Sequence, residues 1–432
     1  MFKCAASSWL ISLCLSAPAG AEPCVLSAAA TAQIQSALRM AMPLIDEPGA
    51  GRDLPQVVAL KDATGRPCTV ATSPPRDIAA RDFGVGNPIA AKQAITAGSP
   101  RVPVPPADAL TLEAGALRKL RFIDLGTLGG PSSNANALND RGDVVGDSNL
   151  PDLTQRAFVW RNGAMQELGT LGGSFSGAAG INNRGQVVGS SQTASGEIHA
   201  YIWRVGNGIL TDLGHLGGGL SIAAAINDAG HVVGASFTAA GELHAFSWTN
   251  GEMTDMGNLG GGFGFARAIN AHGQAVGSSA TAEFSLHAFR WQRQRGLVDL
   301  GVPPGFTDAD ATGISDSGTV VSVSNDDEFR PHAFAWTRGK WTELHPPVPN
   351  SSAVATGVNA AGEAVGVALI DRGDGKSIQH ALVWSRRGVP RDLNQEFGWD
   401  ASFAQAINSN GHVAGLARFA GSPDFRAFVL ER

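Results

Sequence analysis

The chain has 432 residues, a formal net charge of −6 and only 16% charged residues. Its basic residues are mostly dispersed arginines, so the basic surface that nucleic-acid binding requires is missing and we expect no nucleic-acid partner. The 55 glycines and the single tyrosine indicate many tight turns and a repetitive, turn-rich β architecture.

Residues 1–21 are predicted to be a signal peptide. Lys3 gives a basic start, an apolar run follows from residue 9 to 17, and Ala19-Gly20-Ala21 is the small-x-small pattern that a signal peptidase cuts. The mature chain should begin at Glu22 in the periplasm or outside the cell. After the signal, no stretch approaches the roughly 18 consecutive apolar residues of a membrane span, so we expect no span.

The cysteines support the same compartment. Cys14 and Cys24 follow Leu13 and Pro23, where a lipoprotein would need a small residue, so we expect no lipid anchor. After cleavage only Cys24 and Cys68 remain, and in an oxidising compartment they should form a structural disulfide. Two free or catalytic thiols are the alternative.

Residues 22–99 are predicted to form a small α/β module. A helical pattern covers about residues 26–45, a strand-turn-strand pattern lies around 57–70, and a second helical pattern covers 89–96. A Pro-rich linker, residues 100–117, follows. The segments at 26–29, 62–65 and 89–97 faintly resemble the small haem-binding and glycolate-utilisation-associated domain family over about half of the module. We carry no haem ligand over from that resemblance and expect no cofactor.

Residues 118–432 contain seven copies of one repeat. The segment 180–189, Gly-Ile-Asn-Asn-Arg-Gly-Gln-Val-Val-Gly, recurs with its turn glycine at each of the following positions. These are Gly142, Gly185, Gly230, Gly273, Gly318, Gly362 and Gly411, so successive intervals by subtraction are 43, 45, 43, 45, 44 and 49 residues. This period is too long for a solenoid coil of about 20 to 29 residues and fits a propeller blade of about 40 to 45.

Each copy is predicted to contain four strands. Strand one ends in Ile-Asn, an Asn-x-x-Gly turn leads to strand two with Val-Val-Gly, strand three is His-Ala-Phe-x-Trp, and strand four ends in Asp-Leu-Gly. The seventh copy stops after its third strand at Arg432, whereas residues 120–126 are a fourth strand without a third. Because ring closure removes open sheet edges, we predict an all-β, seven-bladed β-propeller whose last blade is completed by residues 120–126.

The repeats resemble a known bacterial family. The segments Leu-Gly-x-Leu-Gly-Gly, Ile-Asn-x-x-Gly-x-Val-Val-Gly and His-Ala-Phe-x-Trp are similar to those of the bacterial extracellular HAF-repeat family, named after its His-Ala-Phe tripeptide. The resemblance covers about three quarters of the chain. It implies an exported repeat protein without an assigned biochemical activity. The last three copies depart from it, because they lack Leu-Gly-Gly.

The residues that recur in every copy are predicted to be structural. Five histidines share one place in strand three, and Arg156 and Arg426 replace them in the other two copies. Strand three lies well outside the inner strand, so equivalent atoms in neighbouring blades are too far apart to share a metal ion, and we expect bonds within each blade instead. The histidines are His199, His244, His287, His332 and His380.

Function is sought where the repeat is broken. The crossovers from strand four to the next strand one, at 303–310, 346–351 and 394–400, lose the glycine pattern and gather acidic and aromatic residues. Acidic oxygens around an exposed indole suit a sugar or a hard cation such as calcium. The candidate ligand-binding residues are Arg267, Phe306, Asp308, Asp310, Asp326, Asp327, Glu396, Trp399 and Asp400. A solvated loop face with drifted sequence is the alternative.

Three functions remain open at this point. The leading hypothesis is a non-enzymatic binding module for a glycan, a cation or an extracytoplasmic protein. Its rival is a hydrolase or lyase that uses carboxylates of Asp308, Asp310, Asp326 and Asp327 as acid and base. The third is a purely structural surface protein. Fold cannot decide among them, because propellers host both binding and catalysis.

Overall fold

The computed structural model describes residues 57–61, 67–71, 120–205, 208–371 and 377–432. The expected signal peptide, both helices of the N-terminal module, the linker and Cys24 lie outside these ranges. Within the module, β1 (Val57–Lys61) pairs antiparallel with β2 (Pro67–Ala71). The two strands expected around residues 57–70 are therefore confirmed, and the turn between them lies outside the described residues.

Each sequence repeat forms one four-stranded antiparallel unit. The first three units are β4 (Ser133–Leu138), β5 (Val144–Asn149), β6 (Gln155–Arg161) and β7 (Ala164–Glu167); β8 (Gly172–Ile181), β9 (Gln186–Thr193), β10 (Ile198–Arg204) and β11 (Leu210–Asp212); β12 (Gly217–Ile226), β13 (Val232–Thr238), β14 (Leu243–Thr249) and β15 (Glu252–Asp255). The fourth is β16 (Gly260–Ile269), β17 (Ala275–Thr281), β18 (Leu286–Gln292) and β19 (Gly296–Gly301).

The remaining units follow the same order. They are β20 (Asp310–Ile314), β21 (Val320–Asn325), β22 (Pro331–Thr337) and β23 (Lys340–Glu343); β24 (Ser352–Val358), β25 (Ala364–Asp371), β26 (Ser377–Trp384) and β27 (Pro390–Asp392); and β28 (Ala401–Ile407), β29 (Val413–Arg418) and β30 (Phe425–Glu431), whose fourth strand is β3 (Arg121–Asp124). The short helix α2 (Leu393–Phe397) lies between β27 and β28.

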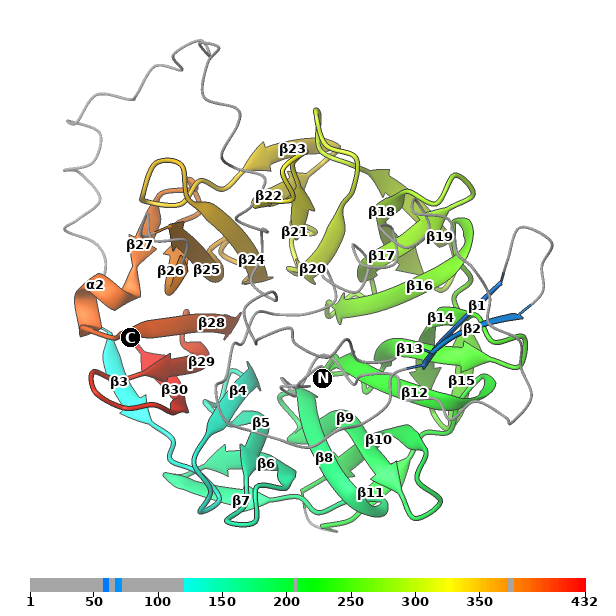
Figure 1. Ribbon diagram of the computed structural model, residues 1–432, viewed down its shortest axis with the longest axis horizontal. Helices are drawn as coiled ribbons and strands as arrows, with labels where there is room; N and C mark the ends of the chain where they lie inside the picture. The colour runs from blue at the N-terminus through cyan, green and yellow to red at the C-terminus, as the bar shows by residue number, and fades with distance from the viewer. Residues whose placement is uncertain (1–56, 62–66, 72–119, 206–207, 372–376) are drawn as a thin grey trace.

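The units stand around a central axis, with the first strand of each innermost and the fourth strand outermost (Figure 1). Single parallel bridges, Ile198 to Leu220 and Leu243 to Phe263, join the second, third and fourth units. This part of the chain is a β-propeller, and we refer to each unit as a blade, numbered by sequence repeat.

The ring is closed by the strand that precedes the first repeat. β3 pairs antiparallel with β30, with Phe122 opposite Leu430, and Figure 1 shows the cyan strand beside the red one. Arg121 and Glu431 form an ion pair of 2.6 Å across this pairing. The predicted closure is confirmed, and β30 is left with no open edge on that side.

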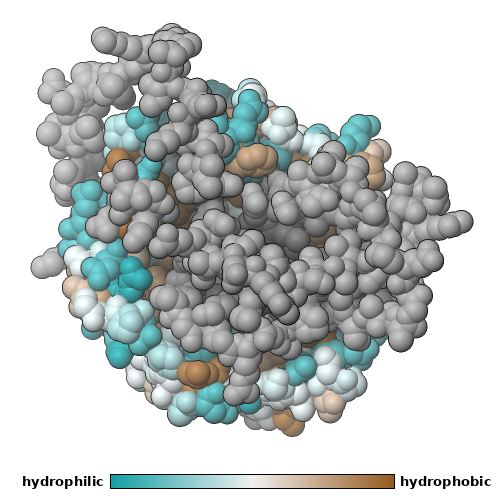
Figure 2. Space-filling model, in the orientation of Figure 1, coloured by the Kyte–Doolittle hydropathy of each residue, from teal (hydrophilic) through white to brown (hydrophobic). Residues whose placement is uncertain are grey.

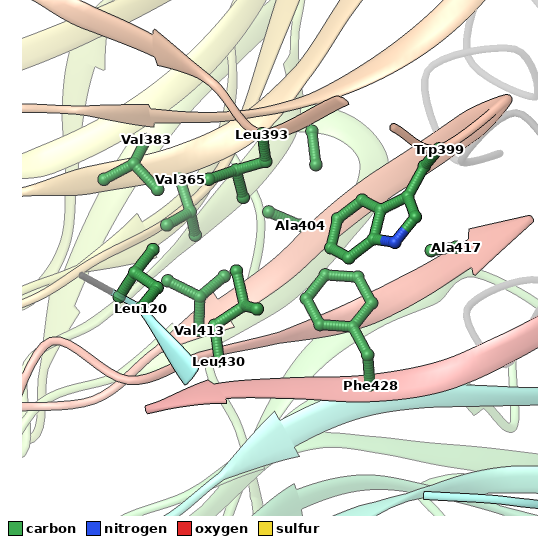
Figure 3. Close-up of a cluster of buried hydrophobic side chains, with 11 residues drawn as sticks. Leu120, Val365, Val383, Leu393, Trp399, Ala404, Val413, Ala417, Phe428 and Leu430 are labelled. Carbon is green, nitrogen blue, oxygen red and sulfur yellow. The ribbon is translucent and has the colours of Figure 1, made fainter. Parts of the chain in front are cut away.

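An aromatic cluster joins this last blade to the sixth (Figure 3). Trp399 stacks on Phe397 with ring centroids 4.9 Å apart, and it lies 4.8 Å from Phe428 of β30 and 5.5 Å from Phe122 of β3. Aromatic rings bury large apolar areas and gain further from such geometry. The strand that closes the ring is therefore held by side-chain packing as well as by the backbone.

Small residues pack the inner strands. One alanine in each first strand is fully buried, and strand two carries glycine opposite it in six repeats. A Cβ on Gly234 would lie 1.9 Å from the carbonyl oxygen of Ile222, so no larger residue fits. The alanines are Ala135, Ala178, Ala223, Ala266, Ala311, Ala355 and Ala404. The inner ring of the propeller is therefore crowded and admits only small side chains at these positions.

A ring of carboxamide hydrogen bonds links neighbouring blades. The turn asparagine at the end of strand one donates from Nδ2 to the backbone carbonyl of the equivalent residue in the next blade, as Asn182 does to Asn227 at 3.0 Å. The same bond runs from Asn139, Asn227, Asn270, Asn359 and Asn408, the last reaching from blade 7 back to Asn139 of blade 1. Blade 5 has Ser315 at this position, whose hydroxyl contacts Ser317 and Thr319 of its own turn.

The seam between blades 5 and 6 should therefore gain stability from Ser315→Asn. The new carboxamide would donate to the carbonyl of Asn359, and such a hydrogen bond contributes about 0.5–1.5 kcal/mol to the free energy of unfolding. Urea unfolding of the full chain measures the change. Ser315→Asp is the matched control, because a carboxylate keeps the acceptor for the turn and lacks the donor. Equal stability of the two variants would contradict the role of the donor.

Candidate functional site

Two kinds of loop share one face of the propeller. Turns between strands two and three lie beside the crossovers from strand four to the next strand one: Gly130 N donates to Asn149 O at 3.0 Å, and Ser285 Oγ donates to Thr307 O at 2.7 Å. We call this the crossover face. The Asn turns between strands one and two lie on the opposite face, which we call the Asn-turn face.

Glycine crossovers are locked by one serine in each of blades 1 to 4. In blade 1, Leu128 N donates to Ser148 Oγ at 2.9 Å, and this hydroxyl donates to Ser132 O at 3.1 Å. Ser191, Ser236 and Ser279 make the same two bonds in the next three blades. In blade 5 the glycine crossover is replaced, and the buried hydroxyl of the equivalent Ser324 has no hydrogen-bond partner among the described residues.

The structure brings two predicted site residues together in a buried ion pair. Arg267 of blade 4 binds Asp310 of blade 5 through two bonds, Nε to Oδ1 at 2.8 Å and Nη2 to Oδ2 at 2.7 Å. The side chains are 13% and 1% exposed. The guanidinium also lies 5.1 Å from the ring of Phe265. This paired geometry satisfies the carboxylate inside the protein and fastens blade 4 to blade 5.

The carboxylate of Asp308, near this pair, is also hydrogen-bonded to another residue of the chain. Its two carboxylate oxygens accept hydrogen bonds from the backbone N–H of Asn325 at 2.7 Å and from Asn325 Nδ2 at 3.0 Å. Burial raises the pKa of Asp308, and the charge of Asp310 raises it further, while the bonds from Asn325 oppose the shift. Asp308 thus holds the crossover of blade 5 against strand β21.

Removing one member of the buried pair should cost stability. Asp310→Ala leaves the guanidinium of Arg267 without its partner, and breaking a buried ion pair costs about 3–5 kcal/mol of unfolding free energy. Arg267→Met combined with Asp310→Leu removes both charges and should be far less destabilising. Chemical denaturation of the two proteins compares them. A loss under about 1 kcal/mol for Asp310→Ala would show that the pair is not needed.

Another predicted site residue, Asp326, belongs to a charged network of blade 5. Its carboxylate binds Arg330 at 2.7 Å and His332 at 3.2 Å, and His332 binds Glu343 of β23 at 2.7 Å. The hydrogen bond to Glu343 raises the pKa of His332, with a further contribution from Asp326. Burial alone would raise the pKa of Asp326, but hydrogen bonds from Arg330 and His332 lower it. The hydrogen bond from His332 also lowers the pKa of Glu343. Phe306 packs on His332 with ring centroids 5.2 Å apart.

This network predicts a pH-dependent coupling between His332 and Glu343. A histidine with a raised pKa stabilises the fold fully below its ordinary value of 6.5, and the contribution is lost as the pH rises through the folded-state pKa. The lowered pKa of Glu343 makes its contribution present above the ordinary value of 4.5 and lost below it. A double-mutant cycle of His332→Gln and Glu343→Gln should give the largest coupling between these two values and a smaller one at about pH 9. A coupling that does not change with pH would refute the charged pair.

The predicted residues near α2 do not form a binding platform. Glu396 pairs with Arg391 at 2.6 Å, and Asp400 is exposed beside the start of β28. Trp399 is only 8% exposed, so the expected exposed indole is wrong. The physical reason lies in the turn after α2: Gly398 ends the helix with φ 71° and directs the chain so that the indole packs on Phe397 and Phe428.

The repeated histidines bond within their own blades, as expected. His244 Nδ1 lies 2.7 Å from the carboxylate of Asp255, which is on strand four of the same blade. His199, His287, His332 and His380 make the equivalent contact, and Arg156 and Arg426 pair with acidic residues in the remaining blades. Within the described ranges, no group of three or more His, Cys, Asp or Glu side chains could hold a metal ion.

Sequence reasoning missed three exposed apolar residues on the crossover face. Leu153, Phe284 and Phe329 are 62%, 65% and 52% exposed, and each lies in the left-handed region with φ of 67°, 61° and 60°. Gly196 and Gly241 hold the equivalent turn position in blades 2 and 3. Comparison of the turns shows the signal: Thr-Ala-Ala-Gly-Glu at 238–242 becomes Thr-Ala-Glu-Phe-Ser at 281–285 and Asp-Asp-Glu-Phe-Arg at 326–330.

A central cavity of about 190 Å³ opens at the Asn-turn face. It is lined by the Asn-turn residues of all repeats, such as Asn139, Asn182 and Asn227, and by none of the nine predicted site residues. Its carboxamides are already bonded around the ring. Asp308, Asp310 and Asp326, which the enzyme hypothesis needs, are bonded to Asn325, Arg267 and Arg330 instead.

No family model and no curated protein matches the chain. Among solved structures, it is similar to TolB from Acinetobacter baumannii, with 12% identity, a TM-score of 0.41 and coverage of 58% of this chain and 63% of that one. It is also similar to YCF48 bound to D1 peptide, with 12% identity, a TM-score of 0.44 and coverage of 72% and 95%.

A structure from a study of two prolyl endopeptidases matches with 13% identity, a TM-score of 0.48 and coverage of 66% of this chain and 46% of that one. The chain therefore spans less than two thirds of the length of the TolB and prolyl endopeptidase structures.

Among the described residues, no helix has the length and apolar character needed to cross a membrane.

Proposed function

We propose that the protein is an exported, closed seven-bladed β-propeller of the HAF-repeat type that acts as a non-enzymatic binding module through its crossover face. The observation that carries this proposal is the group of three exposed apolar side chains at left-handed turn positions: Leu153, Phe284 and Phe329. A bulky residue in this conformation costs about 1–2 kcal/mol, and an exposed ring gains nothing from the core. A binding role gives these residues a purpose that glycine would not serve.

The other readings have less support. Carboxylates of an acid–base pair must face a shared cleft, whereas Asp308 and Asp310 are buried and bonded to other side chains. The predicted sugar site depended on an exposed indole at Trp399, and this indole is buried. A purely structural surface protein would have no use for strained, exposed phenylalanines. A protein partner is therefore the ligand class we favour over a glycan or a cation.

Hydroxyl-radical footprinting tests whether the crossover face is occupied. Leu153, Phe284 and Phe329 should be oxidised in the purified protein and protected at least about threefold in intact cells that produce it, because a partner excludes solvent from an interface.

Val205 and Val389 are the matched controls. Both are exposed and lie in turns between strands three and four, on the opposite face. Their reactivity should be the same in the two preparations. Equal oxidation of the three apolar turn residues in cells and in purified protein would refute the proposed function.

A further inference from the structure

The two exposed phenylalanines stand in neighbouring blades. Phe284 lies in the turn between β17 and β18, and Phe329 in the turn between β21 and β22. Both turns have the same backbone: the N–H of the phenylalanine donates to the carbonyl three residues earlier, Thr281 at 2.8 Å and Asp326 at 2.9 Å. The two rings are thus presented in equivalent positions at the tips of adjacent blades.

We propose that these two turns dock a protein partner whose contacting segment carries basic and apolar side chains. This inference rests on the proposed function. The segments 281–285 and 326–330 define what we call the phenylalanine turns. The two rings would supply the apolar anchors of the interface, and the acidic groups around them would select the charge of the partner.

The charge around the rings is strongly negative. The phenylalanine turns hold four carboxylates, Glu283, Asp326, Asp327 and Glu328, and one guanidinium, Arg330, so their formal net charge is −4 + 1 = −3. Arg330 is committed to Asp326 at 2.7 Å and to Glu328 at 2.9 Å. The equivalent turns of blades 2 and 3 add further carboxylates. These are Glu197 and Glu242. Such a field attracts a basic segment and repels an acidic one.

The geometry favours a protein over a small molecule. Small ligands bind in concave sites that surround most of their surface, whereas the two rings project from turn tips and are more than half exposed. Aromatic residues are enriched among the side chains that dominate the binding energy of protein interfaces. A membrane surface is a poorer occupant, because the carboxylates that flank each ring would be repelled by anionic lipid headgroups.

Both phenylalanine turns are held in place before any partner binds. Ser285 Oγ donates to Thr307 O at 2.7 Å, which ties the first turn to the crossover of blade 5. In the second, Arg330 Nε donates to Asp326 Oδ2 at 2.8 Å, and the backbone N–H of Glu328 donates to Asp326 Oδ1 at 3.0 Å. A surface fixed in this way loses little conformational entropy on association, so the rings can contribute most of their burial to affinity.

The test uses three sets of short synthetic peptides with the full chain: lysine with leucine and phenylalanine, glutamate with leucine and phenylalanine, and lysine with serine. Fluorescence anisotropy should show binding of the first set, at least about tenfold tighter than of the other two, and weakening at high salt. The variant with Phe284→Gly and Phe329→Gly should bind the first set at least about tenfold more weakly, a difference of about 1.4 kcal/mol.

The glycine variant should keep or raise the melting temperature, because glycine adopts the left-handed conformation without strain. Phe284→Asn with Phe329→Asn is the second variant should the first fail to fold, since asparagine also tolerates that conformation. Val205→Gly with Val389→Gly, on the Asn-turn face, is the matched control and should bind as the unaltered protein does.

Several outcomes would overturn the inference. They are the absence of any peptide binding, equal binding of the glutamate set, tighter binding to zwitterionic lipid vesicles than to peptides, and unchanged binding by both phenylalanine variants. If footprinting still shows protection of the crossover face in cells, the proposed function survives and only the assignment of the partner is wrong. If the face is unprotected as well, both fail.

Discussion

The pairing of β3 with β30 is the constraint on which the rest of the propeller depends. Each blade buries its apolar faces only because another blade stands on either side, so one unfilled position would expose two faces at once. The chain meets this requirement by borrowing a strand from before the first repeat. Leu120 and Phe122 also enter the cluster around Trp399, which joins the closing strand to blade 6.

Hydrogen bonds at the seams divide the ring into a regular and an irregular part. Serines in blades 1, 2, 3 and 7 accept from a backbone N–H of the preceding blade, as Ser221 does from Ala200. The equivalent positions in blades 4, 5 and 6 are Gly264, Ala309 and Ala353. Blade 5 also lacks the turn asparagine and the locked glycine crossover. At the seam between blades 4 and 5 the carboxamide bond from Asn270 to Ser315 is kept, and the Arg267–Asp310 pair stands beside it where the serine contact is absent.

Much of the propeller could be predicted from the sequence because the repeat shows its own pattern seven times. The Asn turns, the small residues of strand one and the within-blade bonds of the histidines follow from features that recur, so each copy checks the others. The candidate site was less predictable, because it was sought where the copies differ. Nothing in the local sequence shows that the indole of Trp399 turns inward onto Phe428, a contact that depends on the strand 29 positions further on.

The same difficulty applies to charges. Arg267 and Asp310 are 43 residues apart, and only the closed ring brings them into contact, so their acidic and basic character could be mistaken for a ligand site. The phenylalanine turns could have been found from the sequence, since phenylalanine stands at the turn position that glycine holds in blades 2 and 3. Phe284 and Phe329 were missed because hydrophobic residues in a β-rich sequence are expected in the core. Their exposure became visible only with the backbone conformation.

The carboxamide ring has one further consequence. All its bonds run in the same direction, each blade except blade 5 donating to the next, and the bond from Asn408 to Asn139 is of the same kind as those between the other bonded pairs of blades. The one break in this hydrogen bonding lies between blades 5 and 6, at Ser315, and not where the chain begins and ends. A circularly permuted protein, opened at a crossover and joined between the present ends of the propeller, would keep every carboxamide contact. The carboxamide bonds thus depend on the order of the blades around the ring and not on the position at which the polypeptide enters it.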